Sequence, residues 1–314
     1  MTKYTFLLPA YKATFFEEAL CSIKNQTYMD FKCIVSDDCS PDDLKSIFDR
    51  VCGGDHRFSF RRNEENMGIK NLVGHWNLLV SLCETEYFMM AGDDDLYLPG
   101  FLTSVNQLQE KYPEAGVIRS RSQYIDQNGE ITDQDSVFPE YQDALTFLFY
   151  RYNCFFISGI LNYAFRKDVI IKEKQFLDLP VAWAADEAAV ISCSKYGICT
   201  TNDILTSMRI SGINISCQRN PEISKLKIAA IKSFHEWLLD FIRDTCKADT
   251  ILQKNKLESV LVNANKASLM SIVSYVNDLN LFERLKLLKE LSSKEFIGKG
   301  FQTYKNMTLL IKGN

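Results

Sequence analysis

The sequence predicts an α/β protein with a Rossmann-like, mixed but mostly parallel sheet flanked by helices, followed by a helical module at the C-terminus. Two observations predict this class. In the first part of the chain, short apolar runs alternate with segments of helical periodicity, which is typical of βαβ units. From residue 222 to 297, by contrast, the chain contains neither proline nor glycine, so no strong helix breaker occurs there.

The length and composition allow one large domain and a smaller module. The 314 residues are 46% hydrophobic and 24% charged, as in an ordinary globular protein. We place the large domain at 1–221, with halves at 1–100 and 101–221, and the helical module at 222–314. The N-terminus lacks a signal peptide's long apolar segment, and no run reaches the roughly 18 apolar residues of a membrane span. The ten cysteines form no C-x-x-C pair. We therefore expect a cytoplasmic protein with reduced thiols. The alternative localisation is peripheral, at the inner face of the membrane.

Strands and helices alternate along the first part of the chain. In order, the predicted elements are "KYTFLLPAY", "ATFFEEALCSIKNQT", "DFKCIVSDDCSPDDL", "NLVGHWNLLVSLCE", "EYFMMAGDDD" and "LPGFLTSVNQLQEKYP". Polar or acidic residues end each strand: Tyr11, then Asp37 and Asp38, then Asp93 to Asp95. Because parallel sheets bind ligands beyond the carboxyl ends of their strands, we expect these side chains to share one crevice.

The C-terminal module is predicted to be helical and basic. The segments "KIAAIKSFHEWLLDFI" and "LNLFERLKLLKEL" carry apolar residues near the spacing of amphipathic helices. From Lys225 to the end there are 15 Lys or Arg and 9 Asp or Glu, whereas the whole chain has a net charge of −4. Two interpretations stay open. The helices contact an anionic membrane surface, or they pack on one another or form a homodimer while their lysines face solvent.

The run "AGDDDLYLPG" places three carboxylates directly after an apolar strand. Adjacent like charges repel, and carboxylates near an apolar core need compensation, which a cation would supply. The alternative is a solvated turn, because Asp, Pro and Gly are common in loops. The chain has no G-x-G-x-x-G or G-x-x-x-x-G-K-[ST] phosphate loop. A hard divalent ion held by carboxylates, Mg²⁺ or Mn²⁺, is then the usual partner for phosphates.

Four segments, in order over residues 3–215, resemble those of a known family. They are "FLLPAYKATFFEEALCSIKNQTYMDFKCIVSDDCSPDD", "NEENMGIKNLVGHWNLL", "MMAGDDDLYLPGFL" and "AADEAAVISCSKYG". The chain resembles the inverting nucleotide-sugar transferases of glycosyltransferase family 2, which have the GT-A fold. The resemblance implies transfer of a sugar from a nucleotide sugar, which we take to be a UDP-sugar, to a glycan or lipid-linked glycan in cell-surface polysaccharide synthesis. It also implies that 1–100 binds the nucleotide and 101–221 the acceptor. We expect no nucleic-acid partner.

For the nucleotide, the resemblance implies that the first two strand ends bracket the uracil and ribose. Tyr11 would lie against the uracil ring, and Asp38 would accept a hydrogen bond from its N3–H, with Asp37 as a neighbouring partner. The other residues implied at the nucleotide are Pro9, Ala10, Asn66, Gly68, Lys70 and Asp93. Of these, Asp93 would touch ribose and Lys70 phosphate. The alternatives are a packed aromatic for Tyr11, a turn or cap residue for Asp37, and a solvated lysine for Lys70.

For catalysis, the resemblance implies that Asp94 and Asp95 hold Mn²⁺ or Mg²⁺. Ala91 stands where the commonest family pattern begins this segment with an acid. Asp186 matches the base that takes the proton from the acceptor hydroxyl. Glu187 is a weaker candidate, since the family usually has its second acid before the base. The alternative for both acids is a carboxylate placed at a helix N-terminus, where the helix dipole favours it.

The segment "SMRISGINISCQRN" is similar to one that closes over the diphosphate in many relatives. The resemblance therefore implies that Arg209 contacts the diphosphate, and the alternative is that this segment is a surface loop. The three histidines share no ligand-like spacing. The aromatic-rich "YQDALTFLFYRYNCFFISG" is either a core helix or a surface that stacks on sugars. Two other functions are alternatives. One is a nucleotidyltransferase that makes nucleotide sugars, and the other is a non-catalytic nucleotide-sugar-binding or scaffold protein.

Overall fold

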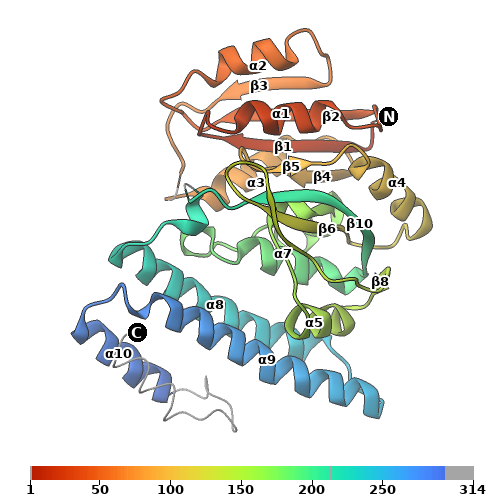
Figure 1. The fold of residues 1–314 in the computed structure, drawn as a ribbon. Helices are drawn as coiled ribbons and strands as arrows, with labels where there is room; N and C mark the ends of the chain where they lie inside the picture. Colours follow the sequence, from red (N-terminus) through yellow and green to blue (C-terminus); the bar gives the residue numbers. More distant parts are fainter. Residues whose placement is uncertain (1, 69, 213, 294–314) are drawn as a thin grey trace.

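The structure is a computed structural model that describes residues 2–68, 70–212 and 214–293. A 10-stranded sheet lies at its centre (Figure 1). The strands are β1 (Tyr4–Ala10), β2 (Phe31–Asp37), β3 (Phe58–Arg62), β4 (Tyr87–Met90), β5 (Leu96–Tyr97), β6 (Val117–Ile125), β7 (Ile131–Gln134), β8 (Tyr141–Gln142), β9 (Tyr163–Arg166) and β10 (Ile198–Arg209). Their order is β3-β2-β1-β4-β9-β6-β10-β5, with β7 paired to β6 and β8 to β10.

The sheet is mixed, and its N-terminal half is parallel. Strands β3, β2, β1 and β4 run parallel to one another, and β10 runs parallel to β6. Strand β9 joins these two groups by antiparallel pairing with both β4 and β6. The three apolar runs predicted as strands are β1, β2 and β4. Because these are parallel neighbours, the polar residues that follow them emerge at one edge, as predicted.

Helices cover both faces of this sheet. The α-helices are α1 (Phe16–Lys24), α2 (Leu44–Cys52), α3 (Leu72–Leu82), α4 (Phe101–Lys111), α5 (Ala144–Asn153), α6 (Lys167–Lys172), α7 (Ala185–Cys193), α8 (Pro221–Thr245), α9 (Ile251–Val276) and α10 (Leu281–Ser293). In β1, Phe6 and Leu8 pack with α1, α2 and α4, whereas Leu7 packs with α3, α5 and α7. Alternate residues of a strand point to opposite faces, which explains this division. The structure confirms the predicted mixed α/β architecture.

Local signals explain where the long C-terminal helices begin. At α8, the side chain of Asn220 accepts a hydrogen bond from the backbone N–H of Ile223, and Pro221 occupies the first helical position. At α9, Thr250 and Gln253 form a capping box. Helices α8 and α9 then run side by side along one side of the molecule (Figure 1). The predicted boundary at residue 221 coincides with the start of α8.

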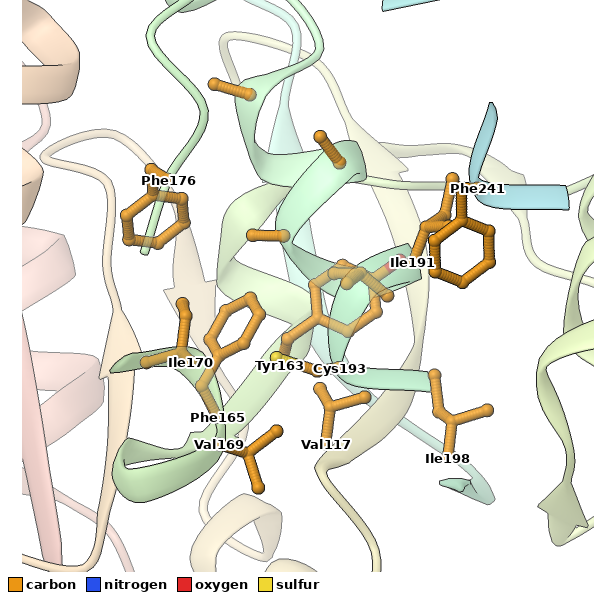
Figure 2. Close-up of a cluster of buried hydrophobic side chains, with 14 of the residues drawn as sticks. Val117, Tyr163, Phe165, Val169, Ile170, Phe176, Ile191, Cys193, Ile198 and Phe241 are labelled. Atoms are coloured by element: carbon orange, nitrogen blue, oxygen red, sulfur yellow. The ribbon is translucent and has the colours of Figure 1, made fainter. Parts of the chain in front are cut away.

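The C-terminal helices share a core with the α/β domain. Phe241 of α8 belongs to the same buried cluster as Ile191 of α7 and Tyr163 of β9 (Figure 2). Helix α10 packs in a smaller cluster with α8 and α9. Residue 221 therefore divides the chain by secondary structure but not by core. The predicted module beyond 293 lies outside the described residues. Within the described part of the chain, no helix is both long and apolar enough to cross a membrane.

Candidate active site

A cavity of about 980 Å³ lies at the carboxyl ends of β1 and β4, at the edge where the sequence predicts a site. Its walls also include the start of α7, the segment after β10 and Ser271 of α9. Both halves of the α/β domain and the C-terminal helices therefore contribute to it. The volume falls in the usual range for small-molecule sites.

The acidic run after β4 is tied to the end of β1. One carboxylate oxygen of Asp93, Oδ2, accepts hydrogen bonds from the backbone N–H groups of Tyr11 and Lys12, each at 2.8 Å. Such charge-assisted bonds are shorter and stronger than neutral ones. Asp93 thus fixes the relative positions of two strand ends. Its predicted contact with ribose stays a prediction.

Asp94 and Asp95 are held from the opposite side, by the segment at and after the end of β10. Asp94 Oδ2 accepts from Asn214 Nδ2 at 2.9 Å and lies 3.7 Å from Lys12 Nζ. Asp95 Oδ1 accepts from the backbone N–H of Arg209 at 2.9 Å. Each aspartate of the run therefore has its own partners, which a freely solvated turn would not provide.

The pair formed by Asp94 and Asp95 fits a hard divalent ion. Burial, then the charge of Asp93, raises the pKa of Asp94 to about 6, and burial raises the pKa of Asp95 well above its usual value. A cation between them would favour both ionised forms. Gly92 keeps this space open, since a Cβ there would lie 2.7 Å from Asp95 Oδ2 and 3.2 Å from Asp94 Oδ1. The described residues contain no group of three or more His, Cys, Asp or Glu that could hold a metal. The remaining ligands would then be phosphate and water, as is usual for Mg²⁺.

Arg209 belongs to the cavity wall, and protein groups bind most of its side chain. Its side chain is 1% exposed, and its guanidinium donates to Glu18 Oε2 at 2.6 Å and to the backbone oxygen of Asp94 at 3.0 Å. The guanidinium also lies 4.2 Å from the ring centroid of Phe15. It therefore braces the acidic run against α1. Its predicted contact with a diphosphate stays a prediction.

Asp37 departs from its predicted role. It is fully buried and is not part of the cavity wall. Its carboxylate accepts a hydrogen bond from the backbone N–H of Ser40 at 2.8 Å and pairs with Arg62. The structure supports the alternative that Asp37 shapes the turn after β2.

Asp38 lines the cavity and organises the segment that follows β3. Its carboxylate accepts four hydrogen bonds from residues 63–68, including the backbone N–H of Gly68 at 2.8 Å and the side-chain amide of Asn66 at 3.1 Å. His75 Nδ1 lies 3.7 Å from Asp38 Oδ1. Asp38 therefore fixes the backbone around Asn66 and Gly68. Its predicted bond to uracil N3–H stays a prediction.

Most of the other predicted residues meet in this cavity. Tyr11 is 42% exposed at the cavity wall, which excludes the alternative of a packed aromatic. Lys70 is also exposed at the wall. The remaining predicted residues that line the cavity are Pro9, Ala10, Asn66, Gly68, Asp93, Asp94, Asp95, Asp186, Glu187 and Arg209. The sequence therefore predicted the composition of this wall well, although the roles of its residues stay predictions.

The first turn of α7 brings Asp186 and Glu187 to the cavity. Burial, then the charge of Glu187, raises the pKa of Asp186 to about 6. Glu187 pairs instead with Arg151, whose Nη2 lies 2.9 Å from Glu187 Oε2. A carboxylate that ionises near neutral pH is suited to act as a general base.

The backbone before Asp186 is strained. Three non-glycine residues with positive φ precede it: Val181 (52°), Ala182 (55°) and Ala184 (63°). Such conformations cost about 1–3 kcal/mol each and persist where the surroundings enforce them. Here Trp183 packs edge-on against Tyr275 of α9, and Lys227 Nζ of α8 lies 4.4 Å from a Trp183 ring. The C-terminal helices therefore hold the segment that presents Asp186.

The sequence did not identify several other residues of the cavity wall, among them Arg151, Trp183, Asn214 and Ser271. One signal was available, because Arg151 is the one charged residue in the otherwise uncharged run 144–157. Trp183, Asn214 and Ser271 reach the cavity only through the packing of α8, α9 and the segment before α8, which no local pattern specifies.

Residues 5–170, more than half of the chain, match the sequence profile of glycosyl transferase family 2. The chain belongs to this family. Among its relatives is a Campylobacter jejuni protein described as GalNAc(5)-diNAcBac-PP-undecaprenol beta-1,3-glucosyltransferase, 32% identical over 108 residues. That match spans 34% of this chain and only 34% of the relative. Membership favours glycosyl transfer over the nucleotidyltransferase alternative.

Solved structures confirm the fold of this family 2 chain. The structure of S. aureus TarS 1–349 in complex with UDP-GlcNAc has a TM-score of 0.58 at 13% identity, and the match covers 99% of this chain and 91% of that TarS chain. The mannosyltransferase PcManGT of Pyrobaculum calidifontis, in complex with GDP-Man and Mn²⁺, gives 0.55 at 14% identity and covers 99% and 85%. At such identities the likeness concerns the fold, which extends through the C-terminal helices.

Proposed function

We propose that this glycosyltransferase moves a sugar from a UDP-sugar to a hydroxyl of a lipid-linked glycan, with inversion at the anomeric carbon, in cell-surface polysaccharide synthesis. One observation carries the proposal. A single cavity contains the paired carboxylates of Asp94 and Asp95 and, from another element, the carboxylate of Asp186. Departure of a diphosphate needs a cation, and attack by a hydroxyl needs a base. The cavity offers a place for each.

The proposed step is a single displacement. The acceptor oxygen forms a bond to the anomeric carbon while the bond from that carbon to the UDP oxygen breaks. The acceptor proton moves to a carboxylate oxygen of Asp186, and the electron pair of the broken bond leaves with UDP. The raised pKa of Asp186, about 6, leaves the group mostly ionised at neutral pH and makes it a stronger base than an ordinary aspartate.

Asp94 and Asp95 are the residues that would hold Mn²⁺ or Mg²⁺. Such an ion would neutralise the charge that develops on the departing diphosphate. Asn214 and the backbone of Arg209 orient the two carboxylates by hydrogen bonds, as outer partners do at metal sites. The presence of Mn²⁺ in the PcManGT complex supports this part of the proposal.

The choice of substrates follows from the relatives and from the cavity wall. TarS is described in complexes with UDP-GlcNAc and with UDP, which supports a uridine nucleotide here. We place the uracil against Tyr11 and near Asp38, and the phosphates toward Asp94 and Asp95. The name of the Campylobacter jejuni relative supports an acceptor carried on a polyprenyl diphosphate.

A thermal-shift panel followed by a transfer assay tests the proposal. UDP with Mn²⁺ is expected to raise the unfolding temperature more than UDP or Mn²⁺ alone, because a ligand that binds only the folded state stabilises it. CDP and GDP serve as matched controls for the base. Mn²⁺-dependent release of UDP from a UDP-sugar, stimulated by a polyprenyl-diphosphate glycan, is the expected activity. A stabilisation by UDP with no transfer or hydrolysis from any UDP-sugar would instead support the non-catalytic binding protein.

We also propose that α10 contacts the membrane. Leu281, Phe282 and Leu285 are exposed on this helix, with Phe282 at 78%, and Lys286 is exposed beside them. An apolar stripe beside lysines suits an anionic bilayer, where a lipid-linked acceptor would lie.

Co-sedimentation with vesicles containing phosphatidylglycerol tests this contact. We expect Phe282→Glu to weaken binding, whereas Ile251→Glu, at the equally exposed Ile251 of α9, leaves it unchanged. Equal binding by both variants would refute the contact through α10. A doubled mass in light scattering that Phe282→Glu abolishes would show that this face forms a homodimer.

A further inference from the structure

The two acids in the first turn of α7 have unequal surroundings. From α5, Arg151 Nη2 donates to Glu187 Oε2 at 2.9 Å, and the Tyr152 hydroxyl donates to Glu187 Oε1 at 3.3 Å. Both oxygens of Glu187 therefore contact α5. The hydrogen bonds that Asp186 accepts come from backbone N–H groups of its own turn. Its carboxylate faces the cavity without a competing cation in direct contact among the described residues.

Arg151 is held in a fixed position. Its guanidinium carbon lies 5.3 Å from the ring centroids of both Tyr152 and Phe156, and its side chain is 23% exposed at the cavity wall. A planar guanidinium in contact with aromatic rings loses rotamer freedom, so its charge is directed at one partner. That partner is Glu187.

We propose that Arg151 is a positioning residue that assigns different roles to the two acids: it retains Glu187 as its ion-pair partner and leaves Asp186 as the single base. This inference rests on the proposed role of Asp186. It also revises the prediction that Glu187 is a second candidate base, because the ion pair with Arg151 and the hydrogen bond from Tyr152 hold its carboxylate against α5.

Charge explains why the pairing matters. An unpaired Glu187 would oppose ionisation of its neighbour, and the guanidinium of Arg151 offsets that effect. The other groups around this end of α7 are Tyr152 of α5, Tyr163 of β9, His75 of α3 and Lys227 of α8. Glu173, which follows α6, pairs with Lys195 at the other end of the helix. None of these residues is substituted in the variants described below.

The pH dependence of kcat/KM in four variants tests the inference. In Arg151→Gln the uncompensated Glu187 is expected to move the acidic limb up by about one pH unit, and in Glu187→Gln the limb is expected to move down. In the double variant Arg151→Gln/Glu187→Gln both charges are gone, so the limb should return close to that of wild type. Arg151→Lys should lie between wild type and Arg151→Gln. The donor KM should change less than threefold throughout.

A role for Arg151 in packing alone predicts a different pattern. The double variant would then be no better than Arg151→Gln, and no variant would move the acidic limb. Either result overturns the inference. Circular dichroism and thermal unfolding identify any variant that fails to fold, and the isosteric Glu187→Gln remains as a test on its own.

A readout without substrate separates this inference from the proposed function. In ¹³C spectra of the carboxyl groups, the signal of Asp186 is the one missing from Asp186→Asn. Its titration midpoint should move up in Arg151→Gln and down in Glu187→Gln even if no sugar is transferred. An unchanged midpoint in both variants would refute the inference, whereas shifted midpoints without any transfer would refute only the proposed function.

Discussion

The cavity contains two acidic runs that differ in how they are held. Asp93, Asp94 and Asp95 follow a buried strand, and their partners come from two other segments of the chain, the end of β1 and the residues at and after the end of β10. Asp186 and Glu187 begin a helix, and one arginine contacts one of them. In the first run the hydrogen bonds fix every carboxylate. In the second, side chains of α5 hold Glu187, whereas Asp186 accepts hydrogen bonds from the backbone of its own turn.

This difference matches the two kinds of chemistry that we propose. Carboxylates that hold a metal need fixed directions, and neighbouring donors provide them. A general base needs a free oxygen and a pKa close to the working pH. Burial raises the pKa of both Asp94 and Asp186 to about 6, so burial alone does not distinguish the two roles. The surrounding contacts do.

The largest effect is expected for Asp186→Asn. Loss of the general base should lower kcat by about 10²–10⁴-fold. The same change should raise stability at neutral pH by about 1–2 kcal/mol. A carboxyl with a raised pKa stabilises the fold while protonated, below its unfolded value near 3.8, and this contribution is lost as pH rises through about 6. Urea unfolding at pH 5 and pH 8 measures it, and the difference between variant and wild type should be larger at pH 8.

Asp186→Asn should still bind UDP with Mn²⁺, because the first acidic run is intact. The matched control is Glu187→Gln, an equally isosteric change one residue away. Comparable loss of kcat in both variants would mean that the second run acts as a pair rather than through one base.

The next effect is expected in the first run. Asp95→Asn should lower kcat/KM by about 10²–10³-fold, since a metal that stabilises a leaving diphosphate contributes several kcal/mol. Its apparent affinity for Mn²⁺ should fall in parallel, as measured by titration of activity with the ion. Asp93→Asn is the control, because Asp93 contacts the backbone of the β1 end. A smaller change is expected there, and an equal loss would show that all three aspartates form one functional unit.

The sequence predicts the first run better than the second. Strand periodicity places Asp93 to Asp95 at a sheet edge, and neighbouring strands bring Tyr11 and Asp38 to the same edge. These relations follow from local patterns and one topological rule. The pairing of Arg151 with Glu187 depends instead on how α5 packs against α7, which no local pattern specifies.

Two of the residues predicted to bind the nucleotide, Arg209 and Asp37, are held mainly by other protein groups. For both residues the resemblance to the family implies a contact with the nucleotide. The structure shows both side chains buried and bound to protein groups of opposite charge, Glu18 and Arg62. Sequence places a residue near a site, but burial of the side chain determines whether a ligand can reach it.

Arg209→Lys tests whether the contacts of the Arg209 guanidinium hold the first acidic run in place. Lysine keeps the charge but cannot contact Glu18 and the backbone oxygen of Asp94 in the same planar arrangement. We expect a loss of stability of about 1–3 kcal/mol, since Glu18 is partly exposed and its pair is screened. Displacement of the metal carboxylates should lower kcat about tenfold. Arg219→Lys, at the half-exposed partner of Asp278, is the control and should change neither. Unchanged activity with reduced stability would limit Arg209 to a structural role.

The smallest effect is expected for Asn214→Ala. Its amide donates to Asp94 Oδ2 at 2.9 Å and to the backbone oxygen of Arg209 at 2.8 Å, so it orients one proposed ligand without being one. Removal of such an outer partner typically lowers metal affinity by about 10-fold or more. The Mn²⁺ concentration for half-maximal activity should therefore rise about tenfold, while kcat at saturating Mn²⁺ stays within about twofold of wild type. The acidic limb of the pH profile should not move, because the second run is untouched.

Asn128→Ala, in the exposed turn between β6 and β7, serves as the control. A tenfold loss of kcat that Mn²⁺ cannot restore would mean instead that Asn214 contacts the substrate, and that the two runs are coupled through the segment after β10.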